Sequence, residues 1–277
     1  MRRGELPLYL FGILVLAWWN FSGDDAHIHT PRQSPPYVDQ SEETPLPRPS
    51  LHDPEVTIDS SGPVRNSTGT AFAIDEDGYW ITARHVVDGC KTVRFHLPWR
   101  FKKPPAARVW LHPNSDMALL EGPAAGGAFS LSDVPAGAGA DAFHIGYPQG
   151  RPGDVWSQVI GRARMITRGR YRIDEPIIAY AEKQRFPNFS GSLGGISGGP
   201  IFDRSGKIIG VTVAESSRRG RVMGTAPRSF KRLFTRADIT PSPTNPESPN
   251  MSPKGLKVTG DDMRQRVVVA KVLCYAS

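Results

Sequence analysis

The amino-acid sequence predicts an all-β fold of the sandwich or barrel kind. Short apolar segments recur along the middle of the 277-residue chain, and turn-forming residues separate them. Strands this short and this evenly spaced are typical of sandwiches and barrels. A Gly- and Ala-rich stretch at residues 122–141 divides the segments into two sets of similar size. The pattern therefore favours two groups of strands joined by one irregular connection.

The expected strands can be read off in chain order. Those before the Gly- and Ala-rich stretch lie at residues 69–75, 78–83, 91–97, 107–112 and 117–121. Those after it lie at residues 142–148, 155–167, 176–181, 200–203, 207–215 and 221–227. A helical pattern is expected only at residues 84–89 and 227–235.

Two segments rich in proline, serine and charge flank this region, at residues 24–55 and 238–254. Neither can bury enough apolar surface to offset the entropy of ordering it. We interpret the first as an extended stalk and the second as a linker, so that one domain occupies residues 56–237. The last segment, residues 255–277, is strand-like and too short to form a domain of its own.

The start of the chain is typical of export. Arg2 and Arg3 precede an apolar run at residues 6–21, and Trp18 and Trp19 stand where a small-residue cleavage site would be needed. Arginines flanking such a run stay on the cytoplasmic side, and tryptophans favour the membrane interface. We expect a signal anchor at residues 1–23 that holds the domain at the inner membrane, facing the periplasm or cell exterior. The alternative is a cleaved signal peptide, and both readings export the rest of the chain.

The net charge is +7, with arginines clustered at residues 161–172 and 218–221. Basic chains attract nucleic acids or membrane surfaces. These arginines are not interleaved with aromatic residues as in a base-stacking platform, so we expect no nucleic-acid partner. The two cysteines show no metal-ligand spacing, and no metal or other cofactor is expected.

One stretch, "GGISGGPIFDRSGKIIGV" at residues 194–211, crowds glycines around Ser197. Glycine at this density destabilises regular structure, so a tight backbone arrangement must require it. Catalysis by a serine hydroxyl needs a base, a group that orients the base, and N–H donors for the oxyanion. Glycines permit such donors to converge, which makes Ser197 a candidate nucleophile.

His85 is the best candidate base, because it directly follows an expected strand and opens a short helical turn. His96 and His144 alternate with apolar neighbours inside strands, which favours a structural role. Asp116 ends a turn and begins an apolar strand, so its carboxylate can be carried inward to orient the base. Taken singly, an aspartate in a turn is more often a turn former.

Together, "GTAF…TARHVV", "SDMALLE" and "GISGGP" resemble the chymotrypsin-like serine peptidases, above all the bacterial high-temperature-requirement or Deg-type branch. The resemblance extends over about residues 63–234. It implies two six-stranded antiparallel β-barrels with a short C-terminal helix, and a peptide substrate. It also implies that His85, Asp116 and Ser197 form a catalytic triad, with the backbone amides of Gly195 and Ser197 as oxyanion hole.

Three features depart from the family pattern. Ile196 stands where many relatives carry an acid that pairs with a freed N-terminus, so activation by N-terminal cleavage is not expected. The segment before Ser197, "EKQRFPNFSGSLGG", is long and is expected to form a loop over the specificity pocket. No PDZ-like domain can fit into the residues that follow the second linker.

The resemblance points to a specificity pocket around Gly191, Ser192, Ala214 and Glu215. Gly191 stands where trypsin carries its acidic pocket floor, so selectivity for arginine or lysine is not supported, and small or apolar residues are favoured instead. Glu215 is expected either at the mouth of this pocket or in a surface turn.

Cys90 and Cys274 are the only cysteines. Cys274 lies in an apolar segment that has to dock on the barrels to bury its valines, and an exported chain meets oxidising conditions. We expect a disulfide between Cys90 and Cys274; the alternative is two unpaired buried thiols.

The sequence therefore predicts a membrane-tethered, exported serine endopeptidase. A catalytically silent trypsin-fold binding or scaffold module at the membrane is the alternative, and Ile196 and the long loop before Ser197 are its support. A polyanion-binding protein that uses the arginine clusters is a third candidate.

Overall fold

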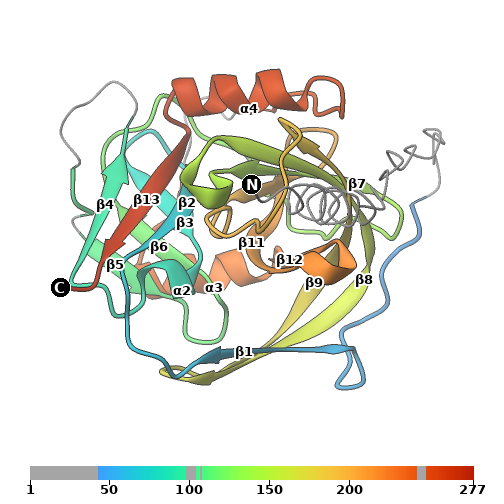
Figure 1. Ribbon diagram of the computed structural model, residues 1–277, viewed down its shortest axis with the longest axis horizontal. Coiled ribbons are helices and arrows are strands. Elements are labelled where there is room, and N and C mark those ends of the chain that lie inside the picture. Colours follow the sequence, from blue (N-terminus) through green and yellow to red (C-terminus); the bar gives the residue numbers. More distant parts are fainter. Residues whose placement is uncertain (1–42, 98–103, 107, 242–247) are drawn as a thin grey trace, which may run out of the picture. The chain divides into compact units, whose positions relative to one another are not determined.

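The computed structural model describes residues 43–97, 104–106, 108–241 and 248–277, and its strands form two sheets (Figure 1). These sheets and a few short helices confirm the expectation of a mainly β fold. The expected anchor or signal peptide at residues 1–23 lies outside the described residues. None of the helices in the described part combines the length and the apolar character needed to cross a membrane.

The first sheet has six antiparallel strands in the order β4–β13–β2–β3–β6–β5. Its strands are β2 (Ser67–Ala73), β3 (Tyr79–Thr82), β4 (Thr92–His96), β5 (Arg108–Leu111), β6 (Ala118–Glu121) and β13 (Val269–Tyr275). In β4, Val93 and Phe95 are buried and alternate with more exposed neighbours, which is the pattern of a sheet with one face on the core. The helix α2 (Arg84–Val87) follows β3 directly.

The second sheet has seven strands in the order β1–β8–β7–β10–β11–β12–β9, and a further pairing of β8 with β9 closes it. Its strands are β1 (Glu55–Ser60), β7 (Asp141–Gly146), β8 (Gly153–Gly169), β9 (Ile173–Phe186), β10 (Pro200–Phe202), β11 (Ile208–Ser216) and β12 (Arg221–Thr225). The helices α3 (Ser229–Ala237) and α4 (Leu256–Gln265) and the 3₁₀ turns η1 (Pro148–Gly150) and η2 (Ser217–Arg219) complete the described elements.

The prediction of two six-stranded antiparallel sheets is wrong for the second sheet, because β1 adds a seventh strand in parallel with β8. β8 is longer than the strand expected at residues 155–167 and extends well past its pairing with β7. Its outer part would leave unpaired N–H and C=O groups at an open edge. β1 satisfies them from Arg164 to Gly169, and its Val56 and Ile58 side chains pack on the core.

The described end of the expected stalk lies against the second sheet. Thr44 forms a bridge with Ala138, the Arg162 side chain donates to the Pro47 carbonyl, and Leu46 packs on a buried apolar cluster. The described residues from Thr44 to Pro47 therefore belong to the folded structure.

The C-terminal segment, expected to be strand-like throughout, begins with the helix α4. Leu256, Gly260 and Met263 are buried on one side of this helix, at the spacing of a helix face. The valines that follow the helix favour a strand, and within this segment only Val269–Tyr275 forms one.

A buried ion pair fastens α4 to the second sheet. Arg264 donates to both carboxylate oxygens of Asp154, at 2.6 and 2.9 Å, and to the Gly146 carbonyl at 3.2 Å. Both side chains are almost fully buried. A bidentate pair of this kind holds a fixed geometry, and removal of one partner would leave an uncompensated buried charge. The pair therefore sets the position from which the chain continues into β13.

β13 lies inside the first sheet, between β4 and β2 (Figure 1). Val269 pairs with Phe72 and Cys274 with Ser67 on one side, and Lys271 pairs with His96 on the other. The last residues of the chain thus complete a sheet whose other strands all come from residues 67–121.

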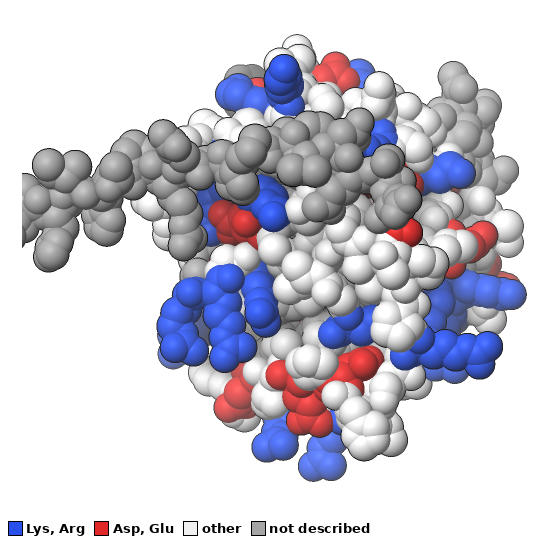
Figure 2. All heavy atoms as spheres, turned by 90° about the vertical axis from the view of Figure 1, so that its right-hand side faces the viewer, with Lys and Arg blue, Asp and Glu red and all other residues white. Residues whose placement is uncertain are grey.

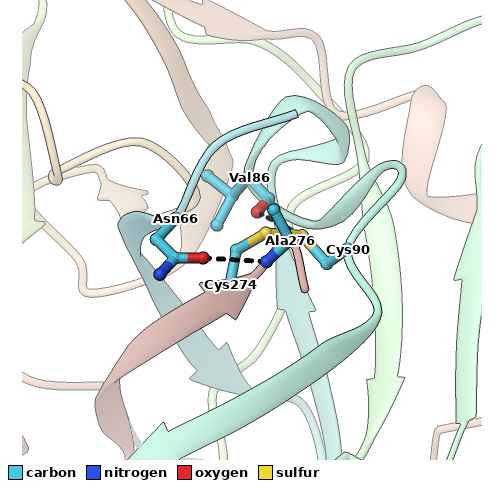
Figure 3. The surroundings of a disulfide bond; sticks show 5 residues. All are labelled: Asn66, Val86, Cys90, Cys274 and Ala276. Atoms are coloured by element: carbon cyan, nitrogen blue, oxygen red, sulfur yellow. Dashed lines mark hydrogen bonds between the residues drawn. A yellow bond between two sulfur atoms is a disulfide. The ribbon is translucent and has the colours of Figure 1, made fainter. Parts of the chain in front are cut away.

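Cys90 and Cys274 form a disulfide at the end of β13 (Figure 3). Around it, Asn66 accepts a hydrogen bond from the Ala276 amide at 2.8 Å, and the Cys90 sulfur lies 3.4 Å from the Val86 carbonyl. Cys90 follows α2 closely in the chain. The disulfide therefore ties the C-terminal strand to the helix that carries His85.

The double variant C90S/C274S is expected to lose up to about 5 kcal/mol of unfolding free energy. The disulfide links residues 184 positions apart, and the chain-entropy model gives about this value for so long a loop. Urea denaturation of the oxidised protein, the protein reduced with dithiothreitol and the double variant measures the effect. The reduced protein and the double variant should show the same unfolding free energy, below that of the oxidised protein. Three coincident denaturation curves would contradict the prediction.

Candidate active site

His85, in α2, and Asp116, just before β6, form a close pair. The His85 ring nitrogen Nδ1 lies 2.6 Å from Asp116 Oδ2, and the His85 amide donates to Asp116 Oδ1 at 2.9 Å. Asp116 is almost fully buried, whereas the His85 side chain is about a third exposed. With Nδ1 held by the carboxylate, the other ring nitrogen of His85 is left to act on a substrate.

The environment of His85 shifts its proton affinity upward. Burial lowers the pKa of the imidazole, but the charge of Asp116 and its hydrogen bond to the ring raise it, and the net pKa lies above the ordinary value of 6.5. At a pH above this pKa the imidazole is neutral, and it can then accept a proton from a reacting group.

The loop that carries Ser197 packs on β2 and on the end of β3. The Thr70 amide donates to the Ser197 carbonyl at 2.8 Å. Gly198 has a positive φ of 88°, and a Cβ there would lie only 2.8 Å from the Ala83 amide nitrogen. Only glycine allows this approach, which brings Ser197 next to the segment that begins α2. Among the described residues, the Ser197 hydroxyl makes no hydrogen bond, to His85 or to any other group.

Two backbone amides, those of Gly195 and Ser197, have no acceptor among the described residues. The Gly194 carbonyl accepts from the Gln149 amide at 2.5 Å, and the Ile196 carbonyl accepts from the Gly199 amide at 2.8 Å. Carbonyl and N–H point in opposite directions across a trans peptide, so these bonds direct the next two N–H groups the other way. Those groups belong to Gly195 and Ser197, and in the described part of the chain neither donates to an acceptor.

Thr70 holds the peptide between these two amides. Its hydroxyl donates to the Gly195 carbonyl at 2.8 Å and accepts from the Tyr147 amide at 3.1 Å. Gly195 has a φ of 102°, and a Cβ there would lie 2.5 Å from the Tyr147 carbonyl. Thr70 stands in the "GTAF" motif, and its role in the loop around Ser197 is visible only in the structure.

Ile196 is buried in an apolar cluster with Val155, Leu193 and Val222. Full burial of an isoleucine side chain contributes about 1.5–3 kcal/mol. At Ile196, where many members of the resembling family carry an acid, apolar packing therefore fixes the loop.

The residues predicted for the specificity pocket are brought together in part. Glu215 accepts hydrogen bonds from the Ser192 hydroxyl and from the Leu193 amide, the latter at 2.7 Å. The Gly191 carbonyl instead accepts from Arg185, at 2.6 Å. Ala214, in β11, packs against the apolar core. Glu215 is thus engaged with the loop before Ser197. Of the long segment before Ser197, residues 182–186 belong to β9 and only the remainder forms the loop.

Two residues that the sequence did not single out cover Asp116. Tyr171 and Glu175 come from the hairpin of β8 and β9, in the other sheet. The Tyr171 hydroxyl lies 3.5 Å from Asp116 Oδ1, and Glu175 Oε1 lies 3.4 Å from the Asp116 amide. Arg84 stacks on the Tyr171 ring, 4.3 Å from its centroid. No local motif could reveal these contacts, because more than fifty positions separate the residues in the chain.

Glu175 is held neutral by its surroundings. Burial raises the pKa of this carboxyl to about 8, the Ser115 hydroxyl opposes the shift, and the charge of Asp116 adds to it. A protonated carboxyl next to Asp116 avoids the repulsion that two buried carboxylates would suffer.

Among the described residues, no group of three His, Cys, Asp or Glu side chains is arranged to hold a metal ion.

Glu175→Gln is expected to stabilise the protein increasingly as the pH rises from about 5 to 8. The folded state keeps Glu175 protonated up to about pH 8, whereas the unfolded chain ionises it near pH 4.5. The folded state binds more protons, so wild-type stability falls with pH in this window, by up to about 1.4 kcal/mol per unit. Glutamine removes that dependence. Urea denaturation of both proteins at several pH values measures the difference.

Asp174→Asn is the matched control, because the neighbouring Asp174 is largely exposed and its pKa is lowered by the hydrogen bond from Arg164. Its difference from wild type should stay constant above pH 5. The expectation for Glu175 fails if Glu175→Gln also shows a constant difference from wild type.

Comparison with known proteins agrees with this geometry. The family model described as trypsin-like peptidase domain matches residues 69–211, just over half of the chain. The matched segment includes His85, Asp116 and Ser197.

Curated relatives include two proteins named probable periplasmic serine endoprotease DegP-like. That of Brucella suis is 31% identical over 163 residues, 57% of this chain and 29% of the relative. That of Marinomonas sp. is 27% identical over 171 residues, 58% of this chain and 33% of the relative. The chain therefore spans about a third of the length of the curated relatives it matches.

Among solved structures, the active form of the Rv3671c protease from M. tuberculosis shares the fold. The match has a TM-score of 0.51 at 18% identity and covers 78% of this chain and all of the other. The chain belongs to the trypsin-like peptidase family.

Proposed function

We propose that this protein is an exported, membrane-tethered serine endopeptidase that cleaves peptide bonds with Ser197, His85 and Asp116. The observation that carries the proposal is the hydrogen-bonded pair of His85 and Asp116 beside a loop in which the amides of Gly195 and Ser197 are free. Base, orienting acid and oxyanion donors are the groups that acyl transfer to a serine requires.

In the first half of the reaction, the Ser197 hydroxyl attacks the carbonyl carbon of the scissile bond. His85 accepts the hydroxyl proton on the ring nitrogen that Asp116 does not hold. The amides of Gly195 and Ser197 stabilise the negative charge on the carbonyl oxygen. His85 then donates its proton to the leaving amine, the C–N bond breaks, and an ester to Ser197 remains.

In the second half, water takes the place of the amine. His85 removes a proton from the water as it attacks the ester, and the Ser197 oxygen leaves with that proton. Asp116 holds the imidazole in one tautomer and stabilises its charged form in both halves.

The substrate strand has an edge to pair with. β10 begins opposite Val211, and the next residue of β11, Thr212, bonds to Gly198 and Gly199. Beyond Thr212, β11 is paired within the described residues on one side only, with β12. An extended peptide can add to such an edge through its main chain. We infer a preference for small or apolar residues at the cleavage site rather than for arginine or lysine, because Gly191 stands where trypsin carries the acidic floor of its pocket.

A silent scaffold is the alternative function. Its support was Ile196 and the long loop before Ser197. Ile196, however, is buried in an apolar cluster that stabilises the loop around Ser197. A nucleic-acid partner has less support. On the face shown in Figure 2, Lys and Arg side chains form several separate groups with acidic side chains between them, rather than one continuous basic groove.

Export is supported by the two periplasmic relatives, and tethering by the sequence of residues 1–23. We expect the N-terminal segment to remain attached, because Trp18 and Trp19 stand where a cleavage site would need small residues. N-terminal sequencing of protein extracted from membranes should find the start of the chain intact. A mature protein that begins anywhere within residues 19–30 would contradict tethering and leave export unaffected.

Ser197→Ala and His85→Ala are each expected to reduce kcat/KM on casein-type peptides by about 10⁴–10⁶-fold, and the double variant by no more, because a triad acts as one unit. Asp116→Asn should lower kcat/KM about 10⁴-fold, because His85 then adopts the wrong tautomer.

Activity should fall with decreasing pH through a midpoint above 6.5, since the pKa of His85 is raised and the base must be neutral.

A fluorophosphonate probe separates the enzyme from the scaffold. It should label wild type and fail to label Ser197→Ala. Multiplicative losses in the double variant, or no labelling of wild type, would refute the proposed mechanism.

A further inference from the structure

A hollow of about 460 Å³ lies on the second sheet, between β1, β8 and the ends of β11 and β12. Its apolar lining includes Val56, Ala163, Ala179 and Met223. Three arginines, Arg162, Arg219 and Arg221, stand around it. We call this feature the arginine hollow.

The arginine hollow begins close to the candidate nucleophile. The Gly198 amide donates to the Thr212 carbonyl and the Thr212 amide to the Gly199 carbonyl, at 2.8 and 2.9 Å, so β11 passes directly behind Ser197. Glu215, three residues further along β11, lines the hollow. At about 3.3 Å per residue this is about 10 Å from Thr212, the distance spanned by three residues of an extended substrate.

The acidic side chains around the hollow have partners within the protein, whereas two of the arginine side chains do not. Glu55 pairs with Arg164 at 2.6 Å, and Glu215 accepts from Ser192 and Leu193. Arg219 and Arg221 are exposed, and the side chain of neither forms a hydrogen bond or ion pair with any residue in the described part. The two carboxylates are thus occupied within the protein, whereas two guanidinium groups can receive an acceptor from outside.

The direction of the substrate follows from the position of His85. The leaving amine must receive its proton from His85, so the part of the substrate after the scissile bond lies on the side of α2. The part before the scissile bond then lies along the unpaired edge of β11, which leads to the arginine hollow.

We propose that the arginine hollow binds an acidic side chain of the peptide substrate, Asp or Glu, located two to four residues before the scissile bond; this proposal depends on the peptidase activity proposed above. The apolar lining accommodates the methylene part of the side chain, and Arg219 and Arg221 pair with its carboxylate. The hollow would make the protein selective for substrates with an acidic residue upstream of the cleavage site.

The test uses the full-length protein in detergent and internally quenched peptides that carry Glu, Gln or Lys at each of these upstream positions. At one position, wild type should cleave the Glu peptide about tenfold faster than the Lys peptide in kcat/KM, mainly through KM, as expected for a partly enclosed charge pair. The preference should weaken with added salt. R219Q/R221Q should abolish it, and R219E/R221E should reverse it.

Arg218→Glu is the matched control, because Arg218 is an exposed neighbour in the same turn that does not line the hollow. It should keep most of the preference for Glu. Cleavage by wild type without any preference for Glu, or an equal loss in Arg218→Glu, would overturn the proposal and leave the peptidase function standing. A wild type that neither cleaves any peptide nor reacts with the fluorophosphonate probe would overturn the peptidase function and this proposal together.

Discussion

The pairing of β13 with β2 is the constraint on which the candidate site depends. β2 lies between β13 and β3, so its position is fixed on both edges. Its Thr70 binds the carbonyls of Ser197 and Gly195, through its amide and its hydroxyl respectively. Through β2, the last strand of the chain therefore stabilises the loop that carries Ser197, the candidate nucleophile. The disulfide and the buried pair of Arg264 and Asp154 hold the two ends of the C-terminal segment in place.

The candidate site lies where the two sheets meet, and each supplies groups that the other lacks. His85 and Asp116 come from the first sheet, and the loop of Ser197 comes from the second. Asp116 is almost fully buried, which would be costly for a carboxylate without compensation. The ring and amide of His85 provide it, and the β8–β9 hairpin excludes water by placing Tyr171 and Glu175 over the group. A neutral Glu175 covers Asp116 without adding a second negative charge.

The loop around Ser197 is organised by main-chain bonds and apolar packing. The Gln149 and Gly199 amides fix the carbonyls of Gly194 and Ile196, and Ile196 itself fills a buried cluster. Neither contact involves a charged group. The residues that fasten its outer part, Arg185 and Glu215, are charged, and their contacts lead directly to the surface where we expect the substrate.

The mainly β class could be predicted from the sequence, and His85, Asp116 and Ser197 could be named as candidates, because strand alternation and the glycines around Ser197 are local signals. The sequence also pointed to the pairing of Cys90 with Cys274, through the absence of any other thiol. Only the tertiary structure decided that β1 joins β8 in parallel, that α4 precedes β13, and that β13 lies inside the first sheet. Those features depend on which open edge a strand can reach and on whether a helix finds a buried partner such as Asp154. Tyr171, Glu175 and the arginines of the hollow belong to the same class, since contacts between residues far apart in the chain leave no pattern in either neighbourhood.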